Sequence, residues 1–302
     1  MKVITLGTSG AVPTLKRSLP AAALQREGEI FLFDCGEGTQ MQLMKAKLSI
    51  YKVEKIFISH LHGDHVVGLP GLLMSLGQTP REKPLFIYGP RGIKDYVLAN
   101  KKHLNFHCEY ELLLREVKEG IISEEDKYRF EAVALDHNHL SLGYALIEKE
   151  RPGKFSVEKA KSLGLEEGPL FGKLQRGEDI KLENGKVIHP RDVLGKPRRG
   201  RKVIYATDTR PCPGVAKLSQ GADVLIHDGM FSQQEEKEAR ERGHSTVTQV
   251  ARMAKDAGVN RLILTHISSR YPDDNLLLKE ARTIFPSAII GRDLMEIEVP
   301  LP

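Results

Sequence analysis

The 302 residues suffice for a large buried core, and no run of about 18 apolar residues and no leader-like N-terminal stretch occurs, which argues against a membrane or secreted protein. Three widely spaced cysteines, Cys35, Cys108 and Cys212, form no CxxC pair, so we expect the reducing cytoplasm and no disulfide framework. The net charge is +5, and residues 150–202 hold 14 Lys and Arg against 8 Asp and Glu, which accounts for the whole positive excess.

Short apolar and β-branched runs that alternate with longer periodic segments predict strands and helices. The expected strands are Lys2–Leu6, Ala21–Gln25, Ile30–Asp34, Lys55–Ser59, Leu85–Tyr88, Gly143–Ile147, Val203–Thr207, Val224–His227 and Arg261–Thr265, with further strands within residues 108–135 and two short ones near Ala288–Ile290 and Met295–Val299. The expected helices are Met41–Lys47, a buried one starting within Val66–Met74, Ile93–Asn100, Val157–Leu163, Gln233–Arg242, Thr246–Ala257 and Leu276–Phe285. This order predicts an α/β fold in which helices cover sheets, with residues 1–302 forming one domain.

A cluster of metal-type side chains follows the strand that ends near Ser59. His60, His62, Asp64 and His65 fall within six residues, and this mixture of imidazole and carboxylate suits Zn²⁺ or a neighbouring transition metal. Gly63 is expected to let the backbone turn, so that the first two histidines face one ion and Asp64 and His65 a second. A polar loop that is rich in histidine by chance is the alternative.

More side chains of this kind recur where later strands end. His137, Asp208 and His266 each follow an expected strand. Because α/β folds assemble sites from strand ends at one edge of a sheet, we expect these three residues to join the cluster.

The segment 150–202 interrupts the pattern. It has 8 glycines and 4 prolines, too few apolar residues for a core of its own, and one expected short helix. We interpret it as an inserted flexible arm that projects from the main body, with an ordinary long connection as the alternative. Its concentrated positive charge is typical of a surface that binds a polyanion.

The cluster from His60 to His65 resembles the His-x-His-x-Asp-His signature of the metallo-β-lactamase superfamily, and His137, Asp208 and His266 follow in that superfamily's order. Over essentially the whole chain the resemblance narrows to ribonuclease Z, the tRNA 3′-processing endonucleases. The similar segments are Gly7–Ser9, Asp34–Gln40, Ala206–Arg210, His244–Thr246, Thr265–Tyr271 and the arm with its Gly168–Pro169 pair.

The resemblance implies an αββα four-layer sandwich and two zinc ions per subunit that activate a bridging water. It implies cleavage of the 3′ trailer from precursor tRNA, leaving a 3′-hydroxyl on the tRNA and a 5′-phosphate on the trailer, by a homodimer whose arms grip the tRNA. By motif match, one ion is held by His60, His62 and His137, the other by Asp64, His65 and His266, and Asp208 bridges them.

Three residues are expected to take part in proton transfer. Asp64 can accept a proton from the attacking water, or serve only as a ligand. His244 lies outside the ligand set, and we assign it as the general acid for the leaving 3′-oxygen. Asp228 is expected to orient His244, although the family usually has the longer Glu at this position. The alternative for His244 is a packing role at a helix start.

Basic residues in two regions are candidate RNA contacts. Lys16 and Arg17 lie in a loop that departs from the family's Pro-x-Lys-x-Arg-Asn and are expected to meet phosphates near the cut, with a solvated basic loop as the alternative. On the arm, the expected backbone contacts are Lys154, Lys159, Lys161, Gly168, Pro169, Lys173 and Arg176. The remaining histidines, at 103, 107, 139, 189 and 227, are expected to be structural or exposed.

Two other functions fit parts of the pattern. A hydrolase of the same superfamily that acts on a small phosphodiester or thioester would use the same metals but would not need the arm. An RNA-binding protein without catalysis would not need the complete ligand set.

Overall fold

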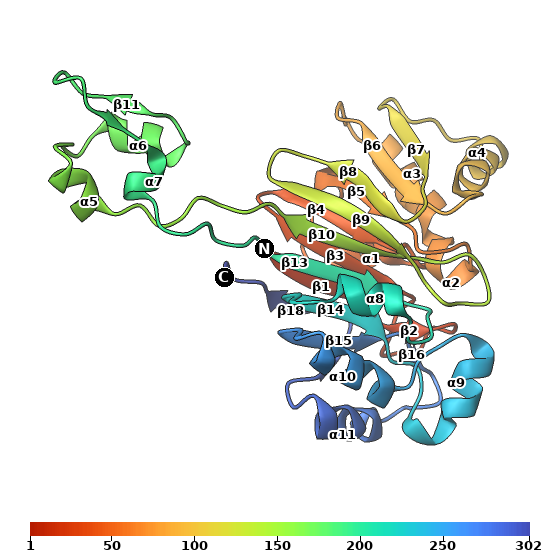
Figure 1. Cartoon of the computed structure of the whole chain (residues 1–302). Helices are drawn as coiled ribbons and strands as arrows, with labels where there is room; N and C mark the ends of the chain where they lie inside the picture. The colour runs from red at the N-terminus through yellow and green to blue at the C-terminus, as the bar shows by residue number, and fades with distance from the viewer. The chain divides into compact units, whose positions relative to one another are not determined.

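Two seven-stranded mixed sheets face each other in the computed structural model, which describes all residues from 1 to 302 (Figure 1). The strands of the first sheet, in spatial order, are β18 (Met295–Glu298), β1 (Lys2–Gly7), β3 (Ala21–Arg26), β4 (Glu29–Phe33), β5 (Val53–Phe57), β6 (Leu85–Gly89) and β7 (Leu112–Glu116). Those of the second sheet are β17 (Ile289–Ile290), β15 (Arg261–Thr265), β14 (Val224–Asp228), β13 (Lys202–Ala206), β10 (Leu142–Glu148), β9 (Tyr128–Ala134) and β8 (Gly120–Glu124). Strands β4 to β7 run parallel to one another, as do β13, β14, β15 and β17.

An aromatic layer fills the space between the sheets. Phe57 lies near its centre, with ring centroids 4.3 Å from Phe130, 5.1 Å from Tyr88 and 5.2 Å from Tyr144. Because alternate side chains of a strand point to opposite faces, each sheet also has an apolar outer face, and both outer faces are covered by further buried clusters. The sandwich therefore has three apolar layers.

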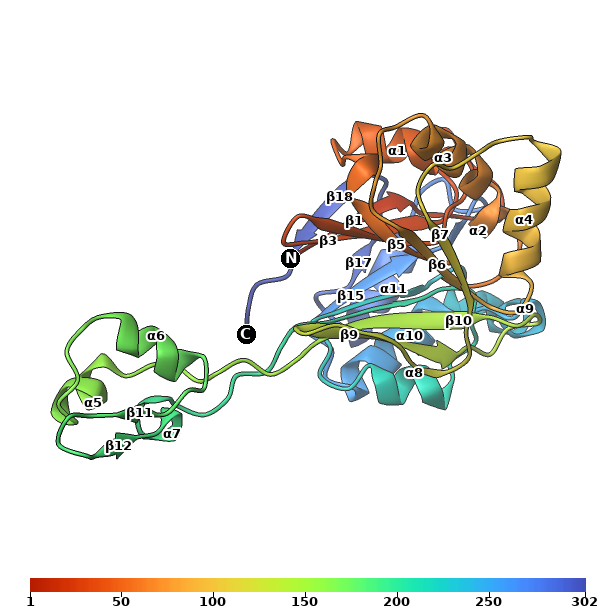
Figure 2. The same ribbon diagram turned by 90° about the horizontal axis from the view of Figure 1, so that it is seen from above.

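Helices cover both outer faces, as Figure 2 shows from above. The first sheet is covered by α1 (Thr39–Lys45), α3 (Gly68–Gly77) and α4 (Ile93–His103), and the second by α8 (Pro213–Leu218), α10 (Val247–Asp256) and α11 (Asn275–Ile284). Helix α10 begins with a capping box in which Thr246 and Gln249 exchange side-chain and backbone hydrogen bonds. The predicted four-layer αββα fold is confirmed. No helix combines the length and the apolarity that crossing a bilayer would require.

Several short elements were not predicted from the sequence. Strands β2 (Ser9–Gly10) and β16 (Ile267–Ser268) pair in parallel, and neither was among the expected strands. The expected helix over Gln233–Arg242 is a turn of 3₁₀ helix, η2 (Gln233–Glu235), followed by α9 (Glu236–Arg242); another such turn is η1 (Ile50–Lys52). Elements of two to four residues carry too few side chains for a period to be visible.

Residues 148–201, together with 301–302, form a compact unit separate from residues 1–147 and 202–300. This smaller unit contains α5 (Val157–Ser162), α6 (Pro169–Gln175), α7 (Pro190–Val193) and the paired strands β11 (Ile180–Lys181) and β12 (Val187–Ile188). The expectations of a single helix and of too few apolar residues for a core are wrong. A small buried cluster exists, because apolar side chains from each short element converge: Ala160, Leu165, Leu174, Ile180, Ile188 and Val193.

Candidate metal centre

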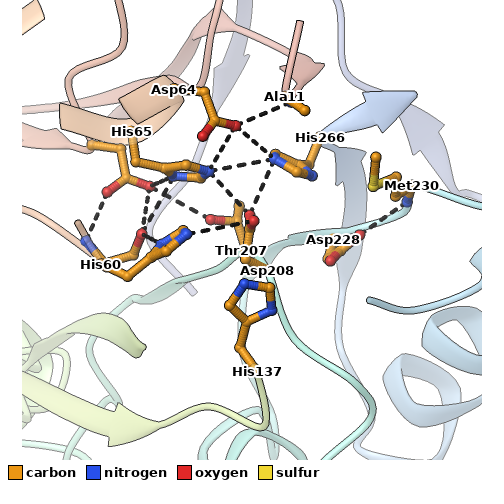
Figure 3. A network of polar contacts seen from close by, with 12 residues as sticks. Ala11, His60, Asp64, His65, His137, Thr207, Asp208, Asp228, Met230 and His266 are labelled. Carbon is orange, nitrogen blue, oxygen red and sulfur yellow. Dashed lines mark hydrogen bonds and ion pairs between the residues drawn. The ribbon is translucent and has the colours of Figure 1, made fainter. Parts of the chain in front are cut away.

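All seven predicted metal ligands converge at one edge of the two sheets. Figure 3 labels each of them except His62. The segment after β5 supplies the cluster from His60 to His65, and the segments after β9, β13 and β15 supply His137, Asp208 and His266. Because the strands of both sheets end at this edge, residues far apart in the sequence meet there.

The seven predicted ligands form two groups of donor atoms, and a further group consists of Asp208, Asp228, His244 and His266. His60, His62 and His137 gather with Asp208, and Asp64 and His65 gather with His266, the donors within each group lying within 4.8 Å of one another. The two oxygens of Asp208 face different groups: Oδ2 lies 3.6 Å from His60 Nε2, while Oδ1 lies 3.2 Å from both His65 Nε2 and His266 Nε2. This carboxylate is therefore placed between the groups.

The chemistry of these donors fits a bound cation. His60 Nε2, His137 Nε2 and Asp208 Oδ1 are buried and have no hydrogen-bond partner, an arrangement that costs about 1–3 kcal/mol for each polar group. Burial lowers the pKa of His60 to about 2 and also lowers those of His62 and His137, so these imidazoles are neutral near pH 7. Neutral imidazole is the form that binds a metal.

A short helix, not a glycine turn, separates the two halves of the cluster. Gly63 is the first residue of α2 (Gly63–Val66) and does not have a positive φ, so the expected change of direction at this residue is made by the start of a helix and requires no left-handed backbone. The helix begins between His62 and Asp64 and so changes the direction of successive side chains. Asp64 Oδ2 also accepts a hydrogen bond from the Ala11 backbone N–H at 3.0 Å, which ties the N-terminal loop to the site.

Asp34 is a residue of this site to which the sequence analysis gave no role. Its carboxylate accepts hydrogen bonds from His65 Nδ1 at 2.7 Å, from the N–H and Oγ of Ser59 and from the Tyr205 hydroxyl at 2.8 Å. By binding Nδ1, Asp34 leaves Nε2 of His65 free to face the site, which is how carboxylates orient metal-binding imidazoles. Its position directly after β4 was the available signal.

Three residues at strand ends adopt a left-handed backbone. Asp34, Asp208 and His266 have φ values of 55°, 56° and 60°. Such backbone conformations cost on the order of 1–3 kcal/mol in residues other than glycine and cluster at functional sites. The fold therefore retains backbone strain where its polar side chains converge.

His244 and Asp228 lie beside the metal-type groups. His244 Nδ1 is 2.7 Å from Asp228 Oδ2, and Asp228 also accepts hydrogen bonds from the backbone N–H groups of Thr209 and Met230. Burial lowers the pKa of His244, but the Asp228 carboxylate outweighs this effect and the net pKa is raised. The shorter carboxylate therefore reaches His244, and the imidazole is held with Nε2 free.

The guanidinium group of Arg17 is bound by other residues of the chain and is not free in solvent. It donates to Thr8 Oγ1 at 2.7 Å, to the Gly291 carbonyl at 2.6 Å and to Asp274 Oδ2 at 2.6 Å. These bonds tie the N-terminal loop to the C-terminal segment, while the neighbouring Lys16 is exposed.

The predicted contacts on the arm lie on its surface. Lys154, Lys159, Lys161, Lys173 and Arg176 are all exposed. Lys161 pairs with Glu167 and Arg176 pairs with Glu178. The Gly168–Pro169 pair is the start of α6.

The other histidines differ in their surroundings. His227 is fully buried with Nδ1 3.0 Å from the Asp228 carbonyl, which agrees with a structural role. His139 is exposed, but its ring centroid lies 4.6 Å from that of His62, so it borders the site.

The chain was also compared with known protein families, sequences and solved structures. Residues 1–136 match the family model described as anti-Pycsar protein Apyc1, and residues 188–267 match the beta-lactamase superfamily domain. The chain is similar to the ribonuclease Z of Methanosarcina acetivorans, with 46% identity over 99% of this chain and 98% of the relative, and to that of Methanothermobacter thermautotrophicus, with 47% identity over 99% and 97%. The crystal structure of the short form of human tRNase Z superposes with a TM-score of 0.74 at 28% identity, over 100% of both chains.

Proposed function

The chain belongs to the ribonuclease Z family of tRNA 3′ endonucleases, and from this premise we propose how its own residues remove the 3′ trailer from precursor tRNA. The observation that carries the proposal is the convergence of seven imidazole and carboxylate side chains, with Asp208 between its two groups, beside a hydrogen-bonded His244–Asp228 pair. The substrate is precursor tRNA, and the reaction is hydrolysis of one phosphodiester bond.

We assign two divalent cations, Zn²⁺ in the first instance, to this site. His60, His62 and His137 would hold one, Asp64, His65 and His266 the other, and Asp208 would contact both. Cations bound there would lower the pKa of a nearby water and neutralise charge on the scissile phosphate.

The proton transfers fall to two side chains. A water oxygen attacks the phosphorus, the bond from phosphorus to the 3′-oxygen breaks, and Asp64 accepts the proton that the water loses. His244 donates a proton to the departing 3′-oxygen, which becomes the 3′-hydroxyl of the tRNA, while the phosphate stays on the trailer. Asp228 accepts from Nδ1 of His244 at 2.7 Å and so keeps Nε2 directed to the substrate.

The arm is proposed to hold the tRNA by its phosphate backbone. Exposed Lys154, Lys159 and Lys173, on a segment with a surplus of positive charge, support this role, and Phe155 and Phe171 pack against each other in its interior. Because these two aromatic side chains contact each other, they are not available to stack on RNA bases. The arm therefore suits recognition of a folded RNA by shape and charge. We expect Lys16 to contribute a phosphate contact near the cut, and Arg17 to hold its loop in place.

Deleting residues 154–195 tests the arm. Gly153 and Lys196 lie at the open end of a ribbon in which the Gly195 N–H donates to the Lys154 carbonyl, so the shortened chain can be rejoined there. We expect cleavage of precursor tRNA to collapse while hydrolysis of bis(p-nitrophenyl) phosphate survives. Equal loss of both activities would overturn the role of the arm.

The main test of the function is the identity of the product ends. A precursor tRNA transcript with a 3′ trailer, incubated with Zn²⁺-loaded protein, should yield a tRNA with a 3′-hydroxyl and a trailer with a 5′-phosphate. An uncut transcript together with efficient hydrolysis of small phosphodiesters or thioesters would instead support the small-substrate enzyme. Binding of the transcript without cutting, with or without chelator, would support an RNA-binding protein.

The proposal includes a homodimer that works in the cytoplasm. The resemblance to ribonuclease Z implies the dimer, and three free cysteines without a bonding partner are compatible with a reducing compartment. Light scattering during gel filtration measures the first point, and a monomer at the concentrations of the cleavage assay would refute it.

A further inference from the structure

Arg210 connects three segments that border the site, although it contacts none of the proposed ligands itself. Its Nε donates to the Arg240 carbonyl at 2.7 Å, Nη1 to Asp136 Oδ1 at 3.1 Å and Nη2 to Asn138 Oδ1 at 2.7 Å. Its backbone N–H donates to the Asp136 carbonyl at 2.9 Å. Every nitrogen of the side chain is thus engaged with the protein, which leaves Arg210 poorly placed to bind a substrate phosphate.

Each partner of Arg210 leads directly to a functional side chain. Asp136 and Asn138 flank His137, a proposed metal ligand, and Arg210 itself lies two residues after Asp208. The Arg240 carbonyl belongs to the last turn of α9, and besides Arg210 it accepts a hydrogen bond from the Gly243 N–H at 3.3 Å. The arginine therefore fastens the His137 loop to the end of the helix that leads into His244.

A second contact joins the same two segments. His137 Nδ1 donates to the Gly243 carbonyl at 2.9 Å, which leaves Nε2 as the free nitrogen. Gly243 has φ of 83°, and a Cβ atom there would lie 2.6 Å from His137 Nδ1. Only glycine allows this approach, so the spacing between the α9 end and the His137 loop must be kept closely.

We propose that Arg210 is a positioning residue that fixes the position of His137 relative to His244. The cation held by His60, His62 and His137 and the general acid His244 would then act on the same phosphodiester. This inference rests on the proposed function. It assigns the arginine to one half of the centre, because no contact of Arg210 reaches Asp64, His65 or His266.

The test compares Arg210→Ala and Arg210→Lys with Arg240→Ala. The Arg240 side chain is exposed on the same helix, and only its carbonyl accepts from Arg210, so Arg240→Ala removes a neighbouring charge and leaves the contact intact. A lysine at 210 keeps the charge but cannot reach three acceptors at once. It keeps the experiment informative if the alanine variant folds poorly.

Zinc affinity is measured first, by competition with a chromophoric chelator, and needs no activity. We expect one of the two binding steps to weaken about 10–100-fold in Arg210→Ala and less in Arg210→Lys, with the other step unchanged. Arg240→Ala should bind both ions as the unmodified protein does. Equal weakening of both steps, or of neither, would overturn the proposal.

Kinetics with bis(p-nitrophenyl) phosphate gives the second readout. We expect kcat to fall in Arg210→Ala with KM nearly constant, and added guanidinium to restore part of kcat. A rise in KM alone would mean that Arg210 binds substrate and would refute the positioning role. If the unmodified protein binds two ions but leaves precursor tRNA uncut, the proposed function fails while the selective zinc effect can still be observed.

Discussion

The substitution Asp34→Asn should lower both the free energy of unfolding and the affinity for zinc. Oδ2 of Asp34 accepts three short side-chain hydrogen bonds, from His65, Tyr205 and Ser59, and a longer one from Thr207 at 3.5 Å, while Oδ1 accepts the Ser59 backbone N–H at 2.7 Å. If the amide oxygen takes the place of Oδ2, three hydrogen bonds lose their charged acceptor, at about 1 kcal/mol each. The amide NH₂ then faces the Ser59 N–H, and the unsatisfied buried donors add about 1–3 kcal/mol.

The expected loss in free energy of unfolding is therefore about 4–6 kcal/mol, a large part of the stability of a typical domain. Urea unfolding of metal-free protein, followed by circular dichroism, measures this loss. Because Asp34 orients His65, zinc affinity should fall as well, by about 10–100-fold.

Asp293→Asn is the matched control. Asp293 accepts hydrogen bonds from Thr8, Ser18 and Gln42 and touches no proposed ligand, so its loss should reduce stability and leave zinc affinity unchanged. Unchanged zinc affinity in Asp34→Asn, or an equal fall in both variants, would refute the orienting role of Asp34.

Three further outcomes are expected. His244→Ala should cut precursor tRNA about 10²–10⁴-fold more slowly in single-turnover assays while retaining both ions, and Asp228→Asn should lie between it and the unmodified protein; full activity in His244→Ala would contradict the general-acid role. Tyr144→Phe removes the donor at 2.7 Å from the buried Ile58 carbonyl and should cost about 1–3 kcal/mol in urea unfolding, and an unchanged midpoint would contradict this. Dialysis against a chelator should abolish cleavage reversibly and lower Tm, because the cations bind only the folded chain; a chelated sample with the Tm of the loaded one would argue against a structural contribution of the metals.

Much of the fold was predictable because its long elements carry clear periods. The strand before His60 ends in Ile56 and Phe57, which are buried like the following Ile58, as expected for a strand that is covered on both faces. The candidate ligands after β13 and β15 could be found from the strand ends alone. The side chains that the motif grouped do lie together, but the structure also gathers Asp228 and His244 with Asp208 and His266. The assignment of particular residues to particular ions therefore stays a prediction.

Other features depend on contacts between distant residues, which no local pattern records. Arg17 looks like a free cation in sequence, and its partners Asp274 and Gly291 lie more than two hundred residues away. The core of the arm is built from single apolar residues on several short elements. Asp34 stood in a recognised motif, but its role became visible only with Tyr205 beside it, a residue from the opposite sheet.

The spread of the donors along the chain has a consequence for synthesis of the protein on the ribosome. His266 follows β15 and is the last donor in the chain, so the group that contains Asp64 is incomplete until β15 has been synthesised. The group that contains His60 needs Asp208, so it too is incomplete until most of the polypeptide has emerged. A product of premature termination before β15 would lack His266 and the strand that carries it. We expect such a fragment to have no nuclease activity, so that cleavage of RNA would begin only after the full-length chain has been translated.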